Sequence, residues 1–158
     1  MKGCLMNLRL AKAHELSILF NIHHSVFRSH IEKLWGWDED WQRLNFVTEF
    51  ANTVTYVIEI EGKVAGYLQL LDEENRMYVQ NLAVSPTFQG QGIGTQLLKD
   101  LQLRAKNRNM SVSLGVFQTN KRAKSLYEQL GFRKVNETRT HIEMLWEHHS
   151  PMGDVSRP

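Results

Sequence analysis

Apolar and polar positions follow a strand-like pattern through the middle of the chain. Residues 53–60 alternate and are rich in β-branched side chains, and 64–71 and 77–84 continue in the same way. The connections 61–63 and 72–76 are short enough for tight turns between neighbouring strands. We therefore expect three consecutive strands joined as antiparallel hairpins.

Four other segments repeat their apolar residues at helical spacing. The first shows this spacing over 13–27, and the pattern breaks at Gly36. After that break, Asp38 is a suitable cap for a second helix. The third covers 93–107 and the fourth 120–131. The residues expected on the buried faces are Leu16, Leu19, Phe20 and His23, then Trp41, Leu44 and Phe50, then Ile93, Leu97, Leu98, Leu101 and Ala105, and finally Ala123, Leu126, Tyr127 and Leu130.

Short strands at the two ends complete the pattern. They are expected at 8–11, at 112–117 and twice within 132–146, with a turn near Asn136. The order is then β, α, α, β, β, β, α, β, α, β, β, in which hairpins precede one β-α-β crossover. This order predicts an α+β fold with a mixed, mostly antiparallel and twisted sheet of about seven strands, covered by helices on both faces.

Composition and charge narrow the class of protein. The chain has 158 residues, 42% hydrophobic and 23% charged, which suits one soluble domain, expected over 1–147 and followed by a flexible tail, 148–158. A net charge of +2 with scattered Lys and Arg argues against nucleic-acid binding. No stretch approaches the ~18 apolar residues of a membrane span, and no signal peptide is expected. Cys4 is the only cysteine, which fits a reducing cytoplasmic setting.

A glycine-rich turn, QGQGIG at 89–94, stands between the strand 77–84 and the helix 93–107. Glycines lack a Cβ, so the amides of such a turn can approach a ligand closely. The first amides of the helix have no partner within it, and the helix end is positive, so the turn suits an anion. The candidate binding residues are Gln89, Gly90, Gln91, Gly92, Ile93, Gly94 and Thr95.

Spacing excludes two familiar phosphate motifs at this turn. A P-loop needs a lysine after its last glycine, whereas Gly94 is followed by Thr95. A dinucleotide fingerprint needs its third glycine where Thr95 stands, and it opens the first β-α unit of a fold instead of following three strands. On these residues alone, an ordinary strand-to-helix loop is also possible.

Two segments resemble the cofactor motifs of the GNAT superfamily, the acetyl-CoA-dependent N-acyltransferases. They are LAVSPTFQGQGIGTQLL (82–98) and NKRAKSLYEQLGF (120–132), which stand in the order of that family and about thirty residues apart. The order of elements is also similar from about residue 8 to 146. Gln89 departs from the pattern, because many members carry arginine there. The loss of that cation leaves the backbone amides of the turn available.

The resemblance implies roles for residues on either side of the turn. A bulge would splay the preceding strand, and the backbone of Leu82, Ala83 and Val84 would pair with the pantetheine arm of acetyl-CoA. Asn120 would contact the same arm, cap its helix, or do both. Tyr127 would donate a proton to the departing CoA thiolate, although its place on the apolar stripe also suits a simple core residue.

The acceptor would be an amine, which must lose its proton before it attacks. For a lysine-like amine this costs about 4–5 kcal/mol at pH 7, so a base or desolvation has to help. Trp35 and Trp37 are candidates for an aromatic wall and Glu39 for a contact to a cation, but the tryptophans equally suit the core and Glu39 a helix cap. The residues able to act as the base are Glu59, His23, His24, His30, Glu39 and His141, with Arg139, His141 and Glu143 expected on one strand face.

The resemblance therefore implies direct transfer from acetyl-CoA to a primary amine in a ternary complex, without a metal or a covalent enzyme intermediate. A small-molecule amine is preferred as the acceptor, and a protein amine remains open. A CoA-binding sensor without turnover and a dinucleotide enzyme are competing hypotheses of other functional classes. The last strands offer a sheet edge, so a homodimer is also left open.

Overall fold

The computed structural model describes residues 6–148, so Cys4 and the tail residues 149–158 lie outside the described residues. The strands are β1 (Met6–Leu10), β2 (Val54–Ile60), β3 (Lys63–Glu73), β4 (Arg76–Val84), β5 (Ser111–Phe117), β6 (Arg133–Glu137) and β7 (His141–Trp146). The helices are α1 (Leu16–Trp35), α2 (Glu39–Asn52), α3 (Ile93–Asn107) and α4 (Lys121–Gln129), with short 3₁₀ turns at Ala13–Glu15 and Pro86–Phe88.

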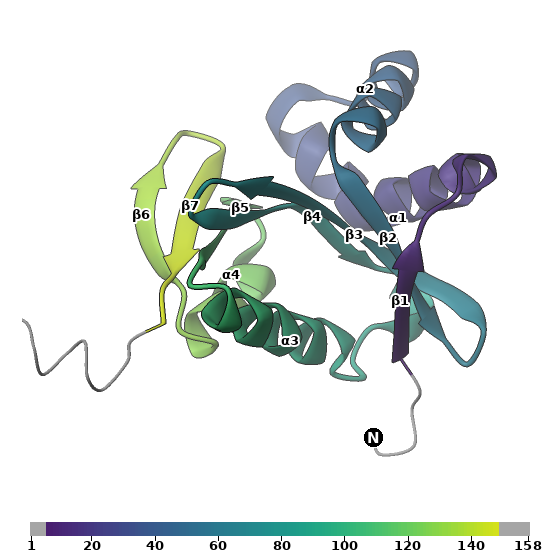
Figure 1. Ribbon diagram of the computed structural model, residues 1–158. Coiled ribbons are helices and arrows are strands. Elements are labelled where there is room, and N and C mark those ends of the chain that lie inside the picture. Colours follow the sequence, from purple (N-terminus) through teal and green to yellow (C-terminus); the bar gives the residue numbers. More distant parts are fainter. Residues whose placement is uncertain (1–5, 149–158) are drawn as a thin grey trace, which may run out of the picture.

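The strands form one seven-stranded sheet in the order β1-β2-β3-β4-β5-β7-β6. Its neighbours are antiparallel except β4 and β5, which the crossover through α3 makes parallel. Figure 1 shows α1 and α2 on one face of the sheet and α3 and α4 on the other. The predicted α+β fold with a mostly antiparallel mixed sheet is confirmed, and β6, exposed along its length, is one edge strand.

Each face of the sheet has its own apolar layer, because the strands carry apolar residues on both sides. On the α3 side, Leu97, Leu98 and Leu101 are buried against β4 and β5, as their spacing predicts. On the other side, Leu19 and Phe20 of α1 pack with Phe46 of α2. The sheet is therefore held from both faces, which fixes the positions of the helices around it.

The predicted buried face of α2 is wrong in part. Trp41 and Leu44 are 57% and 67% exposed, and Gln42 and Phe46 are buried instead. Gln42 is stable there because its side-chain oxygen lies 3.3 Å from His23 Nε2, also buried. The predicted cap is confirmed, since Asp38 Oδ1 accepts a hydrogen bond from the Trp41 amide at 3.0 Å.

The last turn also differs from the prediction. Asn136 lies within β6, beside an irregularity in the β6–β7 ladder, and the chain reverses after Thr138. The Thr138 side chain stabilises this reversal by accepting from the amide of His141 at 3.0 Å. Arg139 therefore lies in the turn, and only His141 and Glu143 share the expected face of β7.

A bulge in β4 separates this strand from β5. Gln69 of β3 pairs with Asn81 and Leu70 pairs with Val79, so Gln80 is left without a partner in β3. The β4–β5 ladder ends at the same point, with the pair Val79 and Leu114. Beyond it the two strands diverge, and the last residues of β4 face a gap.

Gly66 fixes the end of β4, because a Cβ on it would lie 2.1 Å from the carbonyl oxygen of Ala83. We expect Gly66→Ala to destabilise the protein by about 1–3 kcal/mol, the usual cost of overpacking a close backbone contact. Urea denaturation measures this loss. An unchanged midpoint would show that the backbone of Ala83 can move away from Gly66 without cost.

Candidate active site

The turn before α3 has the geometry of an anion site. Gly90 and Gly92 have φ of +81° and +78°, a region that favours glycine, and Gly92 is the N-cap of α3. The Gln96 amide donates to the Gly92 carbonyl at 3.0 Å and is the first with an intrahelical partner. The amides of 93–95 therefore remain available at the positive end of the helix, whose first turn carries no acidic residue.

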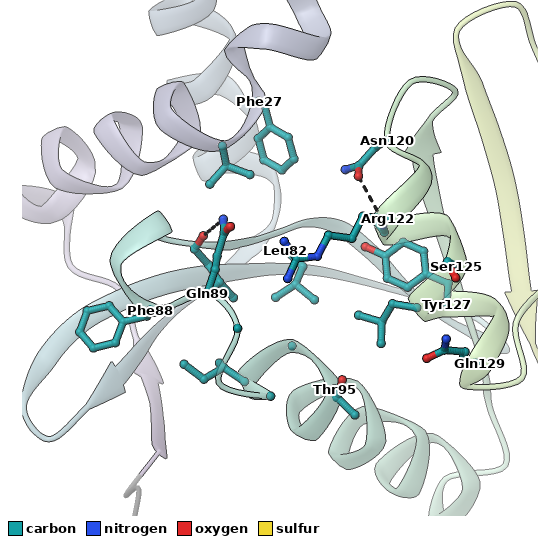
Figure 2. Close-up of a pocket in the computed structure, with 18 of the residues that line it drawn as sticks. Phe27, Leu82, Phe88, Gln89, Thr95, Asn120, Arg122, Ser125, Tyr127 and Gln129 are labelled. Atoms are coloured by element: carbon teal, nitrogen blue, oxygen red, sulfur yellow. Dashed lines mark hydrogen bonds between the residues drawn. The ribbon is translucent and has the colours of Figure 1, made fainter. Parts of the chain in front are cut away.

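The end of β4 presents backbone groups to the gap that have no partner in β5. The Ser85 amide donates to the Ala65 carbonyl at 2.7 Å, and hydrogen-bonded pairs alternate along an antiparallel ladder. The N–H and C=O groups of Leu82 and Val84 consequently point away from β3. The Val84 carbonyl accepts from the Gln89 side-chain amide at 2.8 Å (Figure 2), so Gln89 ties the turn to the strand.

A cavity of about 650 Å³ joins the turn, the end of β4 and α4. Arg122 extends from α4 across this cavity toward β4 (Figure 2). Ala83 and Gln91 do not line it: Ala83 is buried toward α1 and Gln91 is exposed. The predicted cofactor residues that do line it are Leu82, Val84, Gln89, Gly90, Gly92, Ile93, Gly94, Thr95 and Asn120.

Asn120 and Tyr127 of the second motif both face this cavity. The Asn120 oxygen caps α4 by accepting from the Ala123 amide at 3.2 Å, which leaves its NH₂ group free to donate to a ligand. The Tyr127 ring packs on Phe132, with ring centroids 5.9 Å apart. Burial raises the pKa of Tyr127 to about 12, so its hydroxyl stays protonated at neutral pH.

A second cavity of about 660 Å³ opens toward α1, α2 and β7. Aromatic residues and carboxylates from distant parts of the sequence line it. Four residues belong to both cavities: Phe27, Leu82, Asn120 and Tyr127. The two spaces therefore meet at these four residues, Tyr127 among them, where a group held in the first cavity can reach a molecule held in the second.

The predicted acceptor residues divide between this cavity and the nearby surface. Trp35 lines the cavity and is 60% exposed, with its ring 6.2 Å from that of His141. Trp37 and Glu39 do not line it. Trp37 instead donates from Nε1 to Glu39 Oε1 at 2.8 Å and packs edge-on against His24, which leaves both outside the cavity.

The candidate bases divide in the same way. His23 and His141 line the second cavity and His30 the first, while His24 lines neither. Burial lowers the pKa of all three cavity histidines, which favours their neutral forms. Glu59 lines neither cavity and instead forms an ion pair with Arg9 of β1, at 2.8 Å.

Several cavity residues are not marked by the sequence patterns. Arg122 lines the first cavity, and its one signal is a cation two residues after the helix cap Asn120. Glu49 lines the second cavity from α2, and so does Trp41, which was expected instead on the buried face of that helix. Nothing local marks Glu49, because its place depends on how α2 packs over β4. Glu143 is predicted to share a strand face with His141, with solvent and a pocket both left open for that face, and both residues line the second cavity.

The sequence of this chain also matches a known protein family. A family model described as the acetyltransferase (GNAT) family matches residues 16–132. The chain belongs to this family. The match includes both motifs that carried the resemblance, at 82–98 and 120–132, and confirms it.

Curated relatives share part of the chain. The spore coat polysaccharide biosynthesis protein SpsD of Bacillus subtilis is 34% identical over 95 residues, which cover 60% of this chain and 32% of that protein. The L-2,4-diaminobutyric acid acetyltransferase of Vibrio parahaemolyticus is 31% identical over 87 residues, 52% of this chain and 48% of that enzyme. The matches thus span only about a third to a half of the length of these relatives.

Solved structures show the same fold over nearly the whole chain. The PaiA N-acetyltransferase from Thermoplasma acidophilum, solved in complex with coenzyme A, superposes with a TM-score of 0.75 at 16% identity. The match covers 91% of this chain and 99% of that one. Within residues 6–148, no three His, Cys, Asp or Glu side chains are grouped to hold a metal ion, and no helix has the length and apolarity of a membrane span.

Gly94 offers a test of the first cavity. A Cβ added there meets only Leu126 Cδ2, at 4.0 Å, so Gly94→Ala should fold and be as stable as the native protein or more stable. The added methyl group nevertheless enters the cavity, and we expect coenzyme A to bind about tenfold more weakly. Isothermal titration calorimetry measures the change, with Gln96→Ala, outside the cavity, as the control. If Gly94→Ala bound coenzyme A as tightly as the native protein does, the ligand would not bind at this turn.

Proposed function

We propose that the protein transfers an acetyl group from acetyl-CoA to the amine of a small molecule, directly and in a ternary complex. The observation that carries the proposal is the junction of the two cavities at Leu82, Asn120 and Tyr127. A cofactor groove and an acceptor pocket that meet at a protonated hydroxyl are what a direct transfer requires. A volume near 660 Å³ also suits a small molecule.

The residues of the first cavity fit the parts of acetyl-CoA. The free amides of 93–95 suit its pyrophosphate, and Arg122 supplies the cation that Gln89 does not. The outward groups of Leu82 and Val84 suit the amides of the pantetheine arm, which would lie along β4 as an added strand. When bound, acetyl-CoA supplies a thioester whose acetyl group is activated for transfer to nitrogen.

Tyr127 completes the reaction at the junction. The acceptor nitrogen would form a bond to the acetyl carbon and pass its proton to water or to a neutral histidine of the second cavity, His23 or His141, while the carbon–sulfur bond breaks and its electron pair stays on the sulfur. The Tyr127 hydroxyl remains protonated and can donate to that sulfur as its charge develops. Its position on α4, fixed by packing on Phe132, holds it ready for this contact.

Ligand stabilisation tests the cofactor assignment first. A ligand at 100 times its dissociation constant adds ~2.7 kcal/mol to the free energy of unfolding, and we expect a rise in Tm of about 5 °C or more with acetyl-CoA and with CoA. NAD and ATP serve as controls in the same thermal melts. A shift with NAD or ATP but with neither CoA species would overturn the acyltransferase proposal.

Tyr127→Phe tests the role of the hydroxyl. We expect kcat to fall about 100-fold or more while coenzyme A still binds, because a proton donor is lost and the ring remains. Burial raises the pKa of Tyr127 to about 12. At any pH below about 10, ionisation of this hydroxyl should therefore leave the native kcat unchanged. Tyr56→Phe, half-buried and outside both cavities, is the matched control. A kcat within about threefold of native would make Tyr127 a core residue only.

A further inference from the structure

The second cavity carries formal charges of one sign. Asp38, Glu49 and Glu143 line it, and neither lysine nor arginine is found among the described residues of its lining. The remaining polar lining consists of neutral side chains and histidines such as His141, whose pKa is lowered by burial. A ligand in this cavity therefore meets negative charge, and no lysine or arginine of the lining could pair with an anionic group of that ligand.

Glu49 is the carboxylate that most needs such a ligand. It is half-buried on α2, and its oxygens accept from Gln80 Nε2 at 3.0 Å and from Asn81 Nδ2 at 3.1 Å. Both donors are neutral amides, and within residues 6–148 no lysine, arginine or histidine forms an ion pair with Glu49. Burial raises the pKa of Glu49, which reflects the cost of a desolvated charge without a counter-ion.

The hydrogen bonds of Glu49 place it beside the junction of the cavities. Asn81 directly precedes Leu82, which lines both spaces, and Gln80 is the bulged residue at which β4 leaves β5. Asn81 also donates to Gln69 Oε1 at 2.7 Å, and Gln69 is fully buried. The amide that holds Glu49 is therefore itself fixed by the core of the sheet.

Aromatic rings line the same cavity as this carboxylate. Trp35 and Trp41 are exposed there, and Tyr78 lines it from β4. Burial and the charge of Glu143 raise the pKa of Tyr78, and Glu49 adds a smaller effect of the same sign, while Arg76, which lies over this ring but does not line the cavity, lowers it. Aromatic faces attract ammonium groups, and they can also pack against apolar chains.

We propose that the acceptor is a small amine without a carboxylate, which enters the cavity as a cation, and that Glu49 binds its ammonium group before the reacting nitrogen loses its proton. This inference rests on the proposed function and narrows it. An acceptor with a carboxylate would bring that anion among three others, where no cation of the lining offsets the repulsion. The relative from Vibrio parahaemolyticus is named for L-2,4-diaminobutyric acid, which carries such a carboxylate, so this chain should differ from it in selectivity.

Two matched pairs of amines test the selectivity. 1,3-Diaminopropane differs from L-2,4-diaminobutyric acid, and phenethylamine from L-phenylalanine, by one carboxylate each. Release of CoA thiol is followed with each amine at saturating acetyl-CoA. We expect kcat/KM for the carboxylate-free member to exceed that of its partner by about tenfold or more in at least one pair. Equal or higher kcat/KM for both amino acids would overturn the proposal.

Glu49→Gln tests the residue, because glutamine retains the shape and one of the two oxygens that accept from Gln80 and Asn81, and the other amide can turn its own oxygen toward the new NH₂ group. We expect KM for the preferred amine to rise about tenfold or more, with a smaller change in kcat and unchanged binding of coenzyme A. Glu74→Gln, which removes a charge from the exposed β3–β4 turn, is the matched control. A KM unchanged in Glu49→Gln would overturn the assignment of Glu49.

These outcomes separate amine selectivity from acetyl transfer itself. If amines with and without a carboxylate are acetylated with equal kcat/KM, or if KM does not depend on Glu49, this inference is overturned and the proposed function still stands. Absence of thiol release with every amine, in a protein that CoA does stabilise, overturns the proposed turnover and this inference with it.

Discussion

The divergence of β4 from β5 is the feature on which the site depends. Parallel neighbours normally satisfy each other's backbone groups along their whole length, yet this ladder stops at Val79 and Leu114. The bulge at Gln80 sets that point, because one extra residue in β4 shifts the rest of the strand relative to β3. The unpaired edge that results would be costly if it stayed empty and dry, so the gap is suited to an extended, amide-bearing ligand.

The same divergence joins the two faces of the sheet. The first cavity is lined mainly by the turn before α3 and by α4, with Val26, Phe27 and His30 of α1, and the second mainly by α1, α2 and the strands β4, β5 and β7. In a fully paired sheet the strands would separate these spaces, whereas here Leu82 and Tyr127 belong to both. The buried polar chain from Thr55 through Gln69 to Asn81 stabilises the bulge, since each member has a hydrogen-bonding partner.

The sequence was sufficient for features that short segments determine by themselves. Alternation and helical spacing predicted the order of elements, and the turn and Asn120 were recognisable because glycine conformation and helix capping are local. The buried face of α2 was not predictable in this way. Trp41 is more apolar than Gln42, but only the packed structure supplies the partner His23 that lets Gln42 replace it in the core.

This difference extends to the two halves of the site. The proposed cofactor side is built largely from backbone groups of β4 and α3, whose positions a short motif specifies. The proposed acceptor side takes Trp35 from α1, Glu49 from α2 and Glu143 from β7, and no single segment reveals that they meet. Family membership therefore constrains the cofactor side strongly and the acceptor side weakly. Selectivity for the amine has to be derived from the charges and rings that tertiary packing brings together in this chain.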